Sequence, residues 1–150
     1  MDTDAGIAGI VRDHIGNWVL GFQQKCYAQS VLMRELQAIC IGLQIIKERS
    51  WTRVIVNSDS QQAINRILHV ENIKDANFFI VKKCRGLCMR RNEIRLEYEA
   101  RETNRVANRL AKLCRTDVIN KVADALGRNG RSNSFDVNVA SYLPILLVTV

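Results

Sequence analysis

The alternation of strand and helix patterns limits the fold of this chain more than any other feature. Two short apolar segments, residues 7–11 and 18–22, flank the stretch DHIGN, whose Asp, Gly and Asn suit the loop of a β-hairpin. Over residues 30–49, apolar side chains then recur every three or four positions, which predicts a long amphipathic helix with Ser30 as its N-cap.

Shorter segments of both types follow this long helix. Strands are predicted at 52–57 and 93–100, where β-branched or alternating apolar residues stand, and helices at 60–68, 76–91 and 103–114. An opening hairpin followed by alternating helices and strands predicts an α/β fold, with a mixed sheet covered by helices.

The length and the charge of the chain narrow the classes of function. The 150 residues suit one domain. The net charge of +7 fits a polyanionic partner such as nucleic acid, or solubility alone. The five cysteines form no CxxC pair, so we interpret them as reduced thiols of an intracellular protein, in the nucleus or the cytoplasm.

The two ends of the chain indicate neither secretion nor a membrane span. The N-terminus lacks the apolar core of a signal peptide, and the apolar run LPILLVTV at residues 143–150 is too short to cross a bilayer. The polar stretch NGRSNS before it has the composition of a linker. We therefore predict a domain over residues 1–128, and a flexible linker with an apolar tail that docks on the domain over 129–150.

Two acidic residues stand where chemistry or structure could use them. Glu35 lies on the apolar stripe of the long helix, three residues after Leu32, so it is either buried with a partner or at the edge of the stripe. Asp59 directly follows the buried strand VIVNS. Asp59 or Ser60 could cap the next helix, or Asp59 could bind a ligand beyond the end of the strand.

Considered together, the two acids suggest a metal site. If the long helix packs across the strand of residues 53–58, Glu35 faces the end of the strand that carries Asp59. Two converging carboxylates repel each other unless a hard cation such as Mg²⁺ lies between them. Two such ions about 4 Å apart can promote hydrolysis of a phosphodiester.

Four motifs in this order resemble a known family. AGIAGIVRDHIGNWVLGF, RELQAICIGLQI, VIVNSDSQQAI and RETNRVANRLAK are together similar to the ribonuclease H-like domain of plant proteins related to retroelement reverse transcriptases. The resemblance runs from about residue 5 through nearly the whole chain, and the ending SYLPILLVTV shares it. It implies a mixed five-stranded sheet flanked by helices, and cleavage of the RNA strand of RNA–DNA hybrids with two Mg²⁺ ions held by four acids.

The resemblance assigns some of these acids directly. Glu35 matches the acid of the first long helix, and Asp59 matches the acid that ends the fourth strand of the family. The last helix of the family carries an Asp where this chain has Asn108, whose amide oxygen is a neutral ligand. A second copy of that motif, NKVADALGR, offers Asp124 instead, although an unbroken helix would place Asp124 about 24 Å beyond Asn108.

The first acid of the family falls at the start of the chain. Relatives have a strand that ends in NTDGA before the hairpin, and Asp4 in MDTDAGIAGI is either the counterpart of its acid or a loop residue. Three residues before Asp4 are too few for a strand. The resemblance therefore implies that the first, central strand of the sheet is truncated or missing. Tyr98 stands where the family often has a His near the scissile phosphate.

A cluster of basic residues in and after the third predicted helix suggests a surface that binds nucleic acid. They are Lys82, Lys83, Arg85, Arg90 and Arg91, with Arg95 nearby. Contacts of such residues to phosphates would give salt-dependent affinity without sequence preference, whereas a solvated helix face is the alternative.

The hypothesis from sequence is a ribonuclease H-like domain that binds nucleic acid, most simply an RNA–DNA hybrid or double-stranded RNA or DNA. Its metal ligands would be Glu35, Asp59, Asn108 and Asp4, with Asp124 as the alternative to Asn108. Hydrolysis with weakly bound Mg²⁺, or Mn²⁺, would be impaired, because only two of four acids match. The alternatives are an inactive nucleic-acid-binding module and a retroelement-derived fragment.

Overall fold

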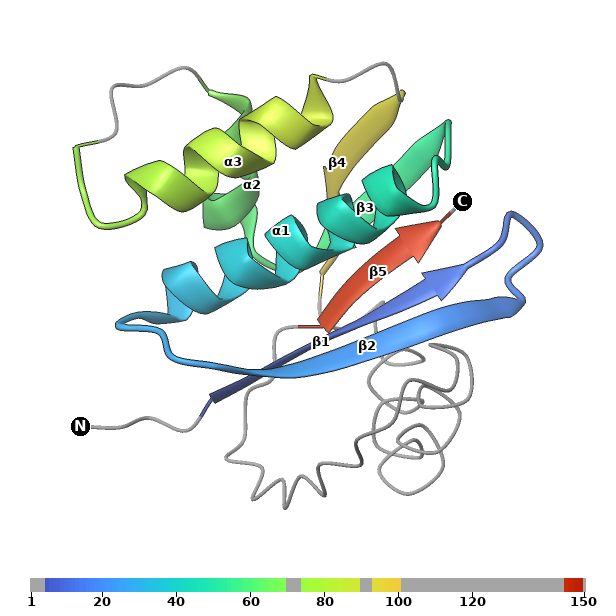
Figure 1. Cartoon of the computed structure of the whole chain (residues 1–150), viewed down its shortest axis with the longest axis horizontal. Helices are drawn as coiled ribbons and strands as arrows, with labels where there is room; N and C mark the ends of the chain where they lie inside the picture. Colours follow the sequence, from blue (N-terminus) through green and yellow to red (C-terminus); the bar gives the residue numbers. More distant parts are fainter. Residues whose placement is uncertain (1–4, 70–73, 90–92, 101–144, 150) are drawn as a thin grey trace.

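The computed structural model describes residues 5–69, 74–89, 93–100 and 145–149 (Figure 1). These residues form five strands and three helices; the bounds are close to those predicted from the sequence except for the last strand, which falls in the tail and was not predicted. In chain order they are β1 (Ala5–Arg12), β2 (Trp18–Cys26), α1 (Val31–Glu48), β3 (Val54–Ser58), α2 (Gln61–Leu68), α3 (Phe78–Cys88), β4 (Ile94–Tyr98) and β5 (Ile145–Thr149). The predicted helix at 103–114 and the proposed domain boundary at residue 128 lie outside the described residues.

The predicted hairpin is confirmed as the antiparallel pair β1 and β2. Its loop is ordered by Asp13, whose Oδ1 accepts hydrogen bonds from the backbone N–H groups of Ile15 at 3.0 Å and Asn17 at 2.7 Å. Gly16 has a φ of +87°, a conformation that a residue without a Cβ adopts at little cost. The loop chemistry therefore sets where β2 begins.

Helix α1 lies across the sheet and supplies much of the core. Ser30 caps it as predicted, since its Oγ accepts a hydrogen bond from the backbone N–H of Met33 at 3.1 Å. Its apolar stripe is fully buried, at Leu36, Ile39, Leu43 and Ile46. Burying side chains of this size stabilises the fold by about 1.5–3 kcal/mol each, so packing against the sheet holds α1 in place.

The three helices form one layer. Helix α1 contacts β1, β3 and β5 on one side, and it also contacts α2 and α3. The main core cluster combines side chains of all three helices with side chains of the sheet. Figure 1 shows α1 over the strands, with α3 beside α1 and in front of α2. No helix among the described residues is long and apolar enough to cross a bilayer.

The sheet is mixed, with the strand order β2-β1-β5-β3-β4. The apolar tail forms β5, which lies at the centre, parallel to β1 and antiparallel to β3 (Figure 1). Val148 of β5 is fully buried. The apolar tail therefore pairs with β1 and β3 and supplies the central strand of the sheet.

Candidate functional site

Asp59 lies just beyond the carboxyl end of β3. Strands β3 and β4 run parallel and end together, because Ser58 pairs with Tyr98 and the backbone N–H of Glu99 donates to the carbonyl of Ser58 at 3.0 Å. The carboxyl ends of neighbouring parallel strands are where α/β sheets commonly bind ligands. Asp59 therefore stands at the edge of the sheet where a ligand site is expected.

Ser60, and not Asp59, caps helix α2. The Ser60 Oγ accepts a hydrogen bond from the backbone N–H of Ala63 at 3.2 Å, and the Ser60 backbone is extended, as an N-cap requires. The Oδ1 atom of Asp59 is buried. Of the two capping residues that the sequence left open, the structure selects Ser60, so the start of α2 does not depend on the Asp59 carboxylate.

Glu35 approaches the same end of the molecule from the helix layer. Strand β2 runs antiparallel to β1, β1 runs parallel to β5, and β5 runs antiparallel to β3. Strands β2 and β3 therefore end at the same edge, and α1 begins there after β2 (Figure 1). Glu35 lies in the second turn of α1 and is only 5% exposed, so it is buried and not at the solvent-exposed edge of the stripe.

The other predicted ligands fall outside the described residues. Asp4 directly precedes β1, and Asn108 and Asp124 belong to the segment 101–144. In the part of the chain that the structure describes, no three His, Cys, Asp or Glu side chains gather closely enough to hold a metal ion. Of the predicted ligands, the described residues therefore include two carboxylates, Glu35 and Asp59; carboxylate oxygens suit a hard cation, but two of them do not complete its coordination.

Sequence reasoning overlooked the role of Ser58 in this turn. Ser58 is buried, and its Oγ accepts a hydrogen bond from the backbone N–H of Ser60 at 3.2 Å. The spacing Ser-x-Ser after a β-branched run was the available signal, because Ser hydroxyls form such local turns. Ser58 and Ser60 together hold the backbone on both sides of Asp59, and this positions its carboxylate.

The predicted basic residues have different surroundings. Lys82 and Lys83 are exposed on α3, and the Lys82 Nζ lies 5.8 Å from the ring centre of Phe78. Arg85 is half-buried and donates hydrogen bonds to the carbonyl oxygens of Ile67 and Arg66, at 2.9 and 2.8 Å, and to that of His69. Arg85 therefore caps the carboxyl end of α2 by hydrogen bonding to its last carbonyl groups.

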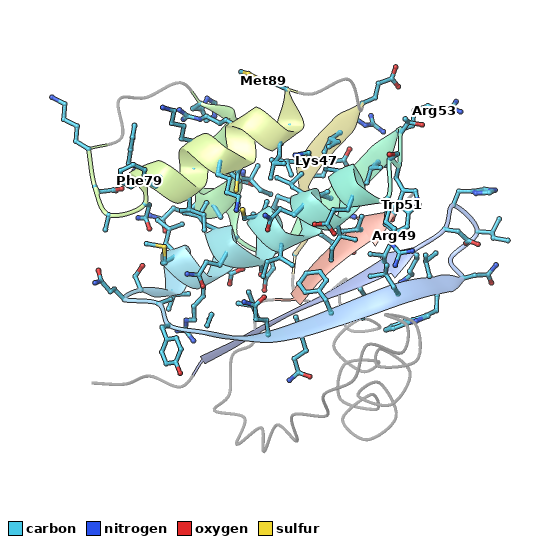
Figure 2. All side chains as sticks on the ribbon, viewed as in Figure 1. Lys47, Arg49, Trp51, Arg53, Phe79 and Met89 are labelled. Atoms are coloured by element: carbon cyan, nitrogen blue, oxygen red, sulfur yellow. The ribbon has the colours of Figure 1, made fainter. Side chains whose placement is uncertain are left out.

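Three further cations were predicted for this surface, and the structure adds one aromatic residue that was not predicted. Arg90 and Arg91 lie outside the described residues, and Arg95 of β4 lies 3.7 Å from Glu97 in an exposed ion pair. Phe79 is 81% exposed at the start of α3 (Figure 2). An exposed aromatic ring near lysines suits stacking on a base, a role that sequence reasoning did not assign to Phe79.

Comparison with known proteins relates these observations to a family. The reverse transcriptase-like family matches residues 1–114. An Arabidopsis thaliana protein named "Putative ribonuclease H protein" is 29% identical over 109 residues, which cover 71% of this chain and 17% of that protein. No solved structure gave a significant match.

The family match covers well over half of the chain, and it includes both Glu35 and Asp59. The mixed five-stranded sheet with a helix layer agrees with the fold that the motifs implied. The chain therefore belongs to the reverse transcriptase-like family, as a ribonuclease H-like domain related to retroelements.

Proposed function

We propose that this chain is an intracellular, nucleic-acid-binding ribonuclease H-like domain whose phosphodiester hydrolysis is impaired. One observation supports this proposal above the others. Asp59 stands at the carboxyl end of β3, and Ser60, not Asp59, caps α2. The buried Glu35 lies in the second turn of α1, which begins at the same end of the sheet. Two carboxylates at one edge suit binding of a divalent cation.

The cation of the proposal is Mg²⁺, with Mn²⁺ as a substitute. Such ions neutralise charge on the attacking and leaving oxygens of a phosphodiester. Glu35 and Asp59 would hold them, and the buried position of Glu35 would keep its carboxylate in one orientation. Asp4 and Asn108, or Asp124, would complete the set. Because Asn108 contributes an oxygen without charge, ion affinity and turnover would both fall.

The proposed substrate is an RNA–DNA hybrid, with double-stranded RNA or DNA as the competitors. Lys82 and Lys83, with Arg90 and Arg91, would contact phosphates, which gives affinity without sequence preference. We leave Arg85 out of this surface because its guanidinium is engaged with the carbonyls of α2. The 2′-hydroxyl is the group by which the domain would distinguish RNA from DNA.

The test is cleavage of a labelled RNA–DNA hybrid, first in Mg²⁺ and then in Mn²⁺. We expect slow cleavage by the wild-type chain. Glu35→Gln and Asp59→Asn should each lower the cleavage rate by more than roughly 100-fold, because loss of a residue that only supports a metal ligand already costs roughly 10–100-fold. Glu48→Gln is the matched control, because Glu48 is exposed at the opposite end of α1. Cleavage that survives Glu35→Gln would contradict the proposed site.

Asn108 supports a second candidate function, a binding module without turnover, because it replaces an acid. A wild-type chain that binds the hybrid without cleaving it in either metal would establish this module. Its affinity should then fall linearly against the logarithm of salt concentration. Lys82→Gln with Lys83→Gln should flatten that slope, whereas Lys47→Gln, at the far end of α1 (Figure 2), should leave it unchanged.

A further inference from the structure

Two cysteines meet where α1 packs against α3. The Sγ of Cys84 donates a hydrogen bond to the carbonyl oxygen of Leu36 at 3.8 Å. Leu36 lies one helical turn before Cys40 in α1, and Cys40 and Cys84 belong to the same core cluster. The Cys84 side chain is also the neighbour with the largest effect on the Cys40 thiol. Both thiols are free in the structure, so the reduced Cys84 of α3 lies against the part of α1 that carries the reduced Cys40.

Cys40 also borders a groove between the sheet and the helices. The groove has a volume of about 380 Å³ and lies among β1, β2, α1 and α3. Cys26, Gln37, Cys40, Gln44 and Lys83 contribute to its lining, whereas Cys84 does not. The two thiols therefore differ in access, because Cys40 faces the groove and Cys84 lies behind it in the core.

The electrostatic surroundings shift the pKa values of the two thiols in opposite directions. The neighbouring side chain of Cys84 lowers the pKa of Cys40 to about 7 against the opposing effect of burial, and the positive charge of Lys83 lowers it further. The neighbouring Cys40 side chain and burial both raise the pKa of Cys84 well above its usual range. The thiolate is the nucleophilic form of cysteine, so Cys40, which is 5% exposed and lines the groove, is the more reactive of the two thiols.

We propose that Cys40 is a peroxide-reactive thiol and that Cys84 is its resolving partner, so that mild oxidation joins α1 to α3 through a disulfide. In the first step the Cys40 thiolate attacks one peroxide oxygen. A sulfur–oxygen bond forms, the oxygen–oxygen bond breaks, and hydroxide leaves, which yields a sulfenic acid.

In the second step the Cys84 sulfur attacks the sulfur of Cys40. The disulfide forms, the sulfur–oxygen bond breaks, and the oxygen leaves as water with the proton from Cys84. The two thiols lose two electrons, and the peroxide gains them. In a reducing compartment cellular thiols would reverse the bond, which makes it a switchable modification.

The test treats the full chain with hydrogen peroxide, blocks the remaining thiols with an alkylating reagent and maps the peptides by mass spectrometry. We expect one cross-linked pair that contains Cys40 and Cys84, lighter than the two reduced peptides by two hydrogens. Cys26→Ser and Cys88→Ser are the matched controls, and the pair should still form in both. A principal link between any other two cysteines, or no link at Cys40, would overturn the proposal.

Two variants separate the attacking thiol from the resolving one. In Cys84→Ser we expect Cys40 to accumulate as a sulfenic acid that a cyclic 1,3-diketone reagent traps. In Cys40→Ser we expect Cys84 to stay reduced. Circular dichroism establishes that each variant is folded. If Cys40→Ser does not fold, trapping of a sulfenic acid at Cys40 in Cys84→Ser is the deciding result. A sulfenic acid trapped at Cys84 in the wild-type chain would show that Cys84 reacts first, which would refute the proposal.

Discussion

At the residue scale, Ser60 and Asp59 are neighbours with different tasks. Ser60→Ala should lower the free energy of unfolding by about 0.5–2 kcal/mol, because α2 loses its N-cap. Asp59→Asn keeps the cap and the side-chain shape, so its effect on stability should be smaller although it removes the proposed cation ligand. Urea denaturation of both variants measures the difference. The reverse order of effects would show that Asp59 caps the helix.

The sequence could not decide between these two residues. Both stand at capping distance from α2, and the choice depends on the backbone dihedral angles of Ser60, φ −105° and ψ 92°, which the turn around Ser58 determines. Glu35 is the contrasting case. Its place on the apolar stripe followed from spacing alone, but its burial depends on how α1 crosses the sheet, which spacing does not reveal.

At the element scale, Arg85 joins α3 to α2. Three carbonyls at the carboxyl end of α2 receive hydrogen bonds from its guanidinium. Arg85→Ala should therefore lower the free energy of unfolding by about 1.5–3 kcal/mol, the range for a hydrogen bond to a charged group. Arg85→Lys should restore only part of it, because an ammonium lacks the planar fork.

The control for Arg85 is its neighbour Lys82, which is exposed on the same helix. Lys82→Ala should change stability by about 0.5 kcal/mol or less. Equal losses in both variants, measured by thermal and urea unfolding, would contradict the bridging role. From sequence Arg85 was one of five similar cations, since a run of basic residues does not show which of them turns inward.

At the scale of the whole molecule, strand order was the part of the fold that spacing could not provide. Hydrophobic patterns predicted the hairpin, α1 and β3 because these depend on neighbours along the chain. The apolar tail carried no signal of its partners, since pairing between β5 and β1 joins residues that are far apart in sequence. The resemblance indicated that the central strand was truncated, but it could not show what fills its place.

The central place of β5 gives the tail a large effect on stability. Val148 is fully buried and pairs with Val11 on one side and Val56 on the other. Val148→Asp would bury a charge in the core, at a cost of several kcal/mol against a total stability of about 5–15 kcal/mol. We expect the variant to lose its cooperative thermal transition in circular dichroism, and hydrogen exchange in β1 and β3 to accelerate. Ile15→Asp, in the exposed hairpin loop, is the control and should melt like the wild-type chain. If Val148→Asp also melts like the wild-type chain, the tail does not form the centre of the sheet in solution.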